Sequence, residues 1–185
     1  MIITNYREKI INAIIFLAGN TNKCGKTKMM KLLYFLDFYH FKQTGKSVTG
    51  FEYFAWEMGP VPKQLFEEIS GKMSRDLNDA IHPLAKEGFQ QIKPKRAFDD
   101  KWFSPRELKI LENLAFIFKD ADASQMIEST HLKNEPWDGT TKEKGLFCPI
   151  DYMLAVDGQD ESLSPDEAKD RMKERREMFE IFGVA

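Results

Sequence analysis

The histidines and cysteines of this 185-residue chain are the side chains best suited to hold a metal ion. His40, His82 and His131 share no ligand spacing with one another or with Cys24 and Cys148. A serine-nucleophile elbow and a zinc-protease helix are also missing, because the chain contains neither Gly-x-Ser-x-Gly nor His-Glu-x-x-His. We therefore predict no metal site, no cofactor and no catalytic residue.

Asp37 is the acidic side chain with the most unusual environment. It falls within the apolar stripe of a predicted helix, where a carboxylate must be hydrogen-bonded or paired. We favour a structural hydrogen bond for this residue. The alternative is a small hydrolase-like enzyme, in which Asp37, His40 and His131 would act as acid and base groups in a cleft.

A Gly-Lys-Thr sequence at residues 25–27 invites comparison with a phosphate-binding loop. Five residues separate its glycine from Gly19, whereas a P-loop has four, and a helical pattern precedes it where a strand is required. We interpret the segment as the start of a helix, with Thr27 as the cap and with Lys26 and Lys28 in solvent.

Helices with buried faces are expected to dominate the first half of the chain. Apolar residues at helical spacing predict a helix over residues 5–18, ended by a left-handed Gly19-Asn20 cap. A second helix, over residues 27–42, is apolar nearly all round and is therefore expected at the centre of the fold. Residues 47–58 predict a strand or hairpin arm, which Gly59-Pro60-Val61-Pro62 should stop before a third helix.

The middle of the chain has weaker patterns. Residues 71–84 allow one more helical piece. A strand at residues 89–93 is expected to pair with a second short strand at 97–103, across a turn at Pro94.

Three helix starts are marked by capping sequences. Ser104 and Ser164 each begin a series of cap, N1 proline and N3 glutamate, and Asp122 with Gln125 forms a third capping box. The last helix, over residues 165–182, is highly charged. Its narrow apolar side is formed by Met172, Phe179 and Phe182.

Composition indicates an ordinary globular protein of the mainly α class. We expect a single helical domain over residues 1–157 with a small β-hairpin or short antiparallel sheet, and a charged helix within 158–185 that packs on it or projects from it. The net charge of −2 argues against nucleic acid as a partner. Two cysteines far apart fit a reducing cytoplasm, and the apolar run at residues 10–18 is too short to span a membrane.

Several short motifs occur together in a recognisable order. They are Lys31-Leu-Leu-Tyr-Phe-Leu-Asp-Phe-Tyr-His40, an aliphatic-Thr-Gly turn at Val48-Thr49-Gly50, the Gly59-Pro60-Val61-Pro62 turn, and His131 followed by Pro136-Trp137. In this order they resemble the Panacea domain, also called the SocA-like antitoxin domain, a family of bacterial and phage genomes. The resemblance covers residues 25–137 and leaves the charged terminal helix outside.

The resemblance implies a mostly helical antitoxin, which neutralises a cognate protein toxin by binding it. Delivery of the toxin to a cytoplasmic protease, homodimer formation, and binding of operator DNA as a transcriptional regulator of its own operon are left open. The residues that carry the motifs are candidates either for holding the fold together or for contacting the partner. These candidates are Lys31, Tyr34, Asp37, His40, Gly59, Pro60, His131 and Trp137.

Overall fold

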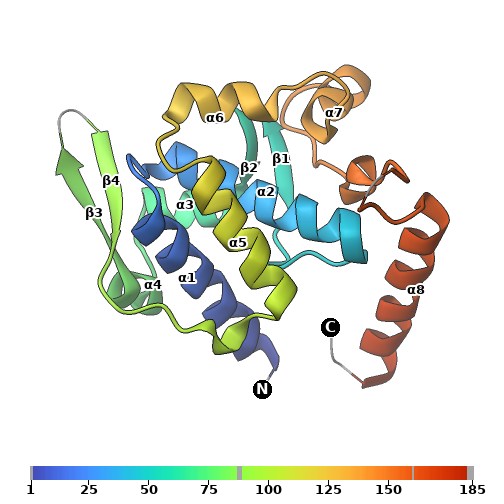
Figure 1. The fold of residues 1–185 in the computed structure, drawn as a ribbon, viewed down its shortest axis with the longest axis horizontal. Helices are drawn as coiled ribbons and strands as arrows, with labels where there is room; N and C mark the ends of the chain where they lie inside the picture. Colours follow the sequence, from blue (N-terminus) through green and yellow to red (C-terminus); the bar gives the residue numbers. More distant parts are fainter. Residues whose placement is uncertain (1, 87–88, 160, 183–185) are drawn as a thin grey trace.

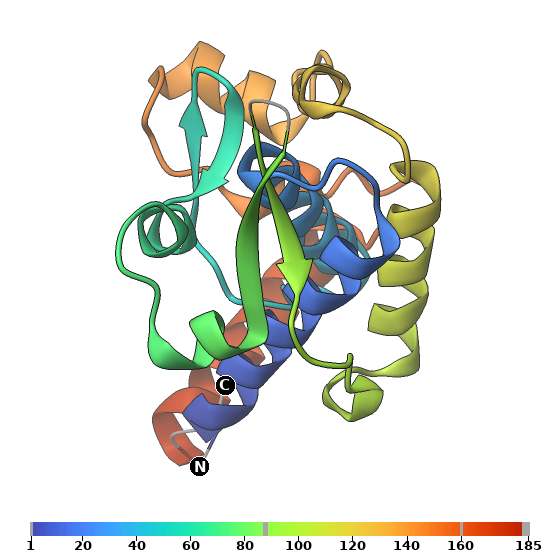
Figure 2. The same ribbon diagram turned by 90° about the vertical axis from the view of Figure 1, so that its left-hand side faces the viewer.

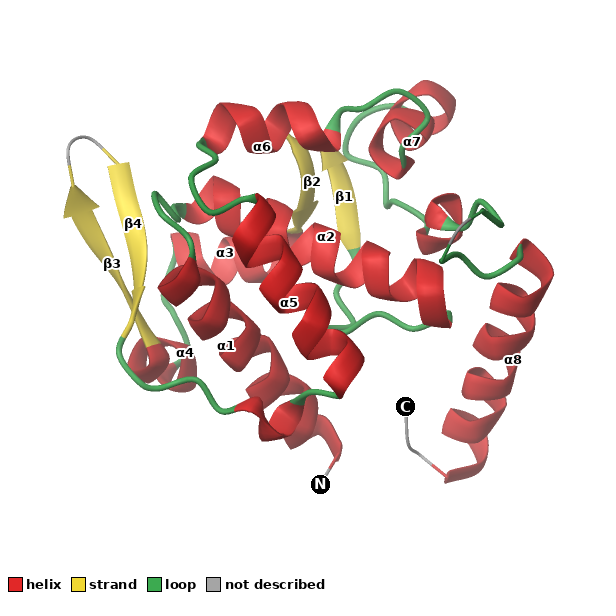
Figure 3. Ribbon diagram, viewed as in Figure 1, coloured by secondary structure: helices red, strands yellow, loops and turns green. Residues whose placement is uncertain are grey.

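The computed structural model describes residues 2–86, 89–159 and 161–182. Within these residues it contains eight α-helices, two short 3-10 helices and two antiparallel sheets of two strands each (Figures 1 and 3). This confirms the predicted mainly α fold with small β elements. In the same part of the chain, no helix combines the length and the apolar character needed to cross a membrane.

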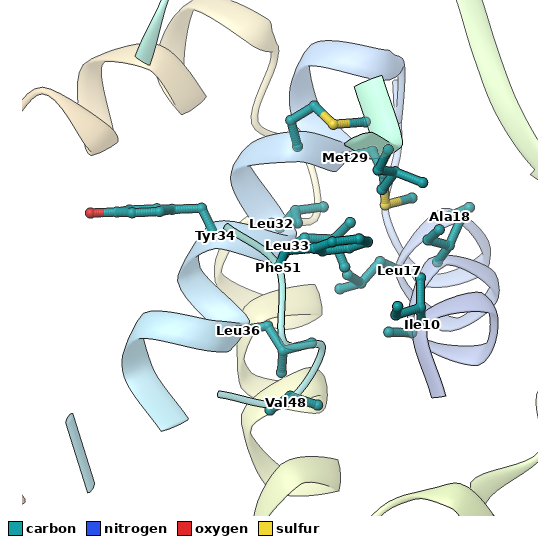
Figure 4. Packing of buried hydrophobic residues seen from close by; sticks show 14 of the residues in the cluster. Ile10, Leu17, Ala18, Met29, Leu32, Leu33, Tyr34, Leu36, Val48 and Phe51 are labelled. Carbon is teal, nitrogen blue, oxygen red and sulfur yellow. The ribbon is translucent and has the colours of Figure 1, made fainter. Parts of the chain in front are cut away.

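Helix α2 (Lys26–Thr44) is the central element of the fold. Twelve of its residues are buried, because it is covered by α1 (Ile2–Asn20), by α5 (Pro105–Ile117) and by the first β-hairpin. Figure 4 shows Leu32, Leu33 and Leu36 of α2 packed with residues of α1 and with Val48 and Phe51. The nearly all-round apolar pattern of this helix therefore predicted its position correctly.

The start of α2 differs from the expectation in two ways. The N-cap residue is Gly25 rather than Thr27, so no N-cap side chain bonds to the first turn. Lys28 does not extend into solvent, since it is 1% exposed. Its ammonium group donates hydrogen bonds to the carbonyl oxygens of Asn22 (2.8 Å), Lys119 (3.2 Å) and Ala121 (2.6 Å). Three converging carbonyls compensate the burial of this cation, which connects the 21–25 loop to the segment after α5.

The expected left-handed cap at Gly19-Asn20 is also wrong. Helix α1 continues through Asn20, whose side-chain amide donates to the carbonyl oxygen of Phe16 (2.8 Å) and so satisfies a group of the last turn. A left-handed glycine instead follows α2. Gly45 has φ of 70°, and its N–H donates to the carbonyl oxygen of Phe41 (2.7 Å).

The Gly-Pro-Val-Pro segment is a strand, contrary to the prediction that it stops one. Strand β1 (Tyr53–Trp56) pairs with β2 (Gly59–Pro62) so that Tyr53 faces Pro62 and Ala55 faces Pro60. The backbone groups of Ala55 bond away from β2, to residues 147 and 148, and the carbonyl of Tyr53 accepts from Ile150. The two prolines therefore occupy positions where no N–H is needed toward β1.

The second hairpin has a different partner from the one expected. Strand β4 (Phe89–Pro94) pairs with β3 (Ile81–Lys86), which follows α3 (Lys63–Ser70) and α4 (Arg75–Ala80). Figure 2 shows this hairpin lying along α1. The segment expected as the second strand contains the 3-10 turn Asp100–Trp102 instead, because the side chain of Asp99 accepts from the Lys101 N–H and starts the turn.

All three predicted capping boxes are confirmed. Helix α5 begins with reciprocal bonds between Ser104 and Glu107, and α6 (Ala123–Thr130) begins with the same exchange between Asp122 and Gln125. Helix α8 (Pro165–Phe182) begins with bonds between Ser164 and Glu167. The sequence patterns did not predict α7 (Pro136–Lys144) or the 3-10 helix η2 (Tyr152–Ala155).

The first half of α8 packs on the C-terminal end of α2. Ala168 is fully buried in a small cluster with Phe41 and Val156, and Met172 packs against this cluster. Arg171 donates to the carbonyl oxygen of Thr44 (3.4 Å). The side chains of Phe179 and Phe182, expected on the same apolar side, lie outside the described residues.

Candidate functional site

Lys31 places an ammonium group inside the protein, beside the first hairpin. Its side chain is 1% exposed, and its Nζ donates to the carbonyl oxygen of Pro60 (2.9 Å). Burial lowers the pKa of Lys31 to about 7. Its Cε and Nζ approach Gly59 so closely that a Cβ on that glycine would lie 3.0 Å from each, and 2.7 Å from Thr130 Oγ1.

Replacing Gly59 by Ala should therefore lower the free energy of unfolding by about 2 to 3 kcal/mol. The new Cβ would meet Thr130 and Lys31, and the residue has φ of 92°, which L side chains rarely adopt. Gly145→Ala is the matched control, because Gly145 has φ of 86° with nothing within 4 Å of the added Cβ. Urea denaturation of both variants separates strain from crowding. Equal losses would show that the contact with Lys31 and Thr130 is not tight.

Replacing Lys31 by Met should remove a pH dependence of stability. The folded pKa is about 7 and the ordinary value is 10.5, so between these values the unfolded state binds more protons and stability rises with pH. From pH 7 to pH 9 the wild-type chain should gain about 2 kcal/mol relative to Lys31→Met. Urea denaturation at both pH values measures this difference, with the exposed Lys72→Met as control. Parallel behaviour of wild type and Lys31→Met would contradict the lowered pKa.

His131 and Trp137 form a stacked pair next to Lys31. Their ring centroids are 3.7 Å apart and the rings are nearly parallel, at 9°. The Trp137 indole Nε1 donates to the carbonyl oxygen of Trp56, at the end of β1 (3.0 Å). Burial lowers the pKa of His131, and the charge of Lys31 lowers it further. The stack thus holds the α6–α7 junction against the hairpin.

Asp37 makes the structural hydrogen bonds that its place in an apolar stripe predicts. Its fully buried carboxylate accepts from the backbone N–H groups of Val48 (2.8 Å) and Thr49 (2.7 Å), from the Thr49 hydroxyl, and from the Tyr53 hydroxyl (2.7 Å). Burial raises the pKa of Asp37 to about 6, against the opposing effect of these hydrogen bonds. Asp37 therefore fixes the loop that follows α2 and connects it to β1.

His40 holds the same loop one turn further along α2. Its Nδ1 lies 2.6 Å from the carbonyl oxygen of Lys46, so this nitrogen carries the proton and donates. The Thr44 hydroxyl lies 3.3 Å from the same nitrogen. Burial lowers the pKa of His40.

The structure divides the eight candidates into two groups, which lie at different positions along α2. The loop group consists of Asp37 and His40, which position residues 46–49. Tyr34 lies between the groups, with its ring against Phe38 (4.3 Å) and Tyr53 (5.7 Å). Burial raises its pKa. The other five residues lie in the first hairpin or next to it and are called the hairpin group below. They are Lys31, Gly59, Pro60, His131 and Trp137.

The acid–base alternative requires Asp37, His40 and His131 to share one cleft. Among the described residues no hydrogen bond joins any two of them, and each lies in the separate setting given above. The same residues contain no group of three or more His, Cys, Asp and Glu side chains arranged for a metal ion. The geometry is that of a scaffold.

Three exposed apolar side chains lie at the turn end of the hairpin, and the sequence patterns did not single them out. Met58 (60% exposed) is in the turn, Leu132 (57%) follows His131, and Phe147 (61%) lies beside Trp56 with ring centroids 6.3 Å apart. Figure 1 shows this end of the hairpin between α6 and α7. We call these three residues the hairpin patch. A methionine next to Gly-Pro in a turn is the only sequence signal that could have indicated it.

Comparison with known proteins gives one match. A family model described as "Antitoxin SocA-like, Panacea domain" matches residues 29–138, which is more than half of the chain. No curated protein and no solved structure was found to match. The matched segment runs from α2 into α7 and contains both groups of candidate residues. The chain therefore belongs to the SocA-like antitoxin family, defined by the Panacea domain.

Proposed function

We propose that this chain is an antitoxin that neutralises a protein toxin by binding it directly. The family match over residues 29–138 carries the proposal. The matched residues supply buried hydrogen bonds, a stacked ring pair and fixed turns. These features build a rigid support, and rigid support is what a preformed protein-binding surface requires.

The hairpin patch is the surface we assign to the toxin. Met58, Leu132 and Phe147 are exposed apolar side chains at one end of the fold. The hairpin group holds the backbone beside Met58 and Leu132, and the Phe147 N–H donates to the carbonyl oxygen of Ala55 in β1. Methionine and aromatic residues are enriched in protein interfaces, and a few such side chains supply most of the binding energy. The hairpin group thus acts as support for the contact surface.

A growth assay tests the proposal. The reading frames on either side of this gene are expressed in a bacterial host, each alone and together with this chain. One of them should stop growth alone and allow growth in co-expression. Absence of a toxic neighbour, or continued growth arrest in co-expression, would contradict the proposal.

The same assay separates binding from removal of the toxin. An epitope-tagged toxin should remain at an unchanged level in protected cells, as expected for occlusion. Loss of the tagged toxin from these cells would show delivery to a protease and would contradict neutralisation by occlusion.

A further inference from the structure

A second apolar surface lies on the opposite side of α2 from the first hairpin. Helices α2 and α5 border a groove of about 830 Å³. Phe35 and Phe118 form part of its wall, with stacked rings whose centroids are 5.1 Å apart. Tyr39 (53% exposed) and Ile117 (66%) lie at its rim. The stacked rings give the groove a fixed apolar wall.

The α5 side of this groove is positively charged. Arg106 and Lys109 are exposed there, and among the described residues neither makes an ion pair. Glu161 also lines the groove, but its carboxylate accepts from the Gln43 side chain (3.2 Å). An occupant should therefore combine apolar side chains with carboxylates.

Helix α8 carries such a combination on the side that faces away from the domain. Ala168 and Met172 face the domain. Glu174 lies three and four residues before Glu177 and Met178, and Ile181 lies four and three residues after them, so the four residues share one other side of the helix. Met178 is 53% exposed and Ile181 is 71% exposed. We call these four residues the outer face of α8.

The outer face is not available to the groove of its own chain. Ala168, together with the contact of Arg171 with Thr44, fixes α8 by another side. Figure 1 shows α8 at the edge of the molecule, apart from α5. The groove of a second copy of the chain can receive the outer face, because the apolar and charged residues of the two surfaces are complementary. The 13 residues of α5 extend over about 20 Å, and the outer face from Glu174 to Ile181 covers about 10 Å, so the lengths are compatible.

We propose that two copies of this chain form a symmetric dimer in which the outer face of each α8 occupies the α2–α5 groove of the other copy. A two-fold axis makes the contact twice, which doubles the buried surface. Glu174 and Glu177 of one copy then approach Arg106 and Lys109 of the other. The proposal concerns a surface remote from the hairpin patch and does not depend on the toxin.

Charge reversal on the two surfaces tests the dimer. Light scattering after size exclusion should give the full chain twice the mass of one copy. Arg106→Glu with Lys109→Glu, and separately Glu174→Lys with Glu177→Lys, should weaken association by about 100-fold and give monomers. An equimolar mixture of the two double variants should recover the dimer, because both contacts again join opposite charges. Lys169→Glu, on a different side of α8, should remain dimeric.

The outcomes decide between the proposal and its alternatives. Circular dichroism melting checks that each variant is folded, and the exposed Ile181→Asp provides an independent disruption if a charge variant fails to fold. A monomeric wild-type chain at all concentrations overturns the proposal. A dimer that resists both reversals, or a mixture that stays monomeric, shows association through another surface and also overturns it.

Discussion

Asp37→Ala should lower the free energy of unfolding by about 4 kcal/mol, the largest effect expected of any substitution considered for this chain. The substitution removes the acceptor of four hydrogen bonds, leaves the buried N–H groups of Val48 and Thr49 unpaired, and opens a cavity. Urea denaturation followed by circular dichroism measures the loss as a shift of the midpoint.

Asp37→Asn provides the matched comparison. Its amide oxygen can still accept from the backbone, and its amide nitrogen can donate to the hydroxyls of Thr49 and Tyr53, so the loss should be smaller than for Ala. A denaturation midpoint for Asp37→Ala equal to that of the wild type would show that the carboxylate does not hold the loop.

Lys28→Met should lower the free energy of unfolding by about 3 kcal/mol. Three carbonyl oxygens, of Asn22, Lys119 and Ala121, would lose a charged donor in a buried setting. Burial already lowers the pKa of Lys28, and Met restores most of the volume but none of the hydrogen bonds. Urea denaturation gives the size of the effect.

Lys23→Met is the control for Lys28→Met, since Lys23 is exposed in the loop just before α2. It should change stability by less than about 0.5 kcal/mol. Equal stability of the two variants would contradict the role of Lys28 in joining the 21–25 loop to the segment after α5.

Local signals predicted the helices well where the chain encodes them within a few residues. The capping boxes at Ser104, Asp122 and Ser164 are exchanges between residues three apart, so the sequence shows both partners. The β2 strand was missed because prolines favour the end of a strand. Only the register of the folded hairpin, with Pro60 opposite Ala55 and Pro62 opposite Tyr53, shows that neither proline needs an N–H toward β1.

The candidate site was predictable in composition but not in arrangement. The motifs named Lys31, Asp37 and His131 as candidates for holding the fold or contacting a partner, yet their division into two groups follows from which segments pack on each side of α2. Lys28 was misplaced for the same reason. Nothing local in the sequence marks a lysine in the first turn of α2 as buried, since two of the three carbonyls that compensate its charge come from Lys119 and Ala121, in the segment after α5.

Direct binding of the purified chain to its purified neighbour-encoded toxin tests the central claim. Isothermal titration calorimetry should show saturable binding by the wild type and by Phe116→Asp, which alters an exposed aromatic residue on α5. Met58→Asp with Phe147→Asp should weaken the binding by more than about 100-fold while the chain stays folded. Undiminished binding by that double variant would contradict the hairpin patch as the contact surface, and absence of binding by the wild type would contradict neutralisation by direct contact.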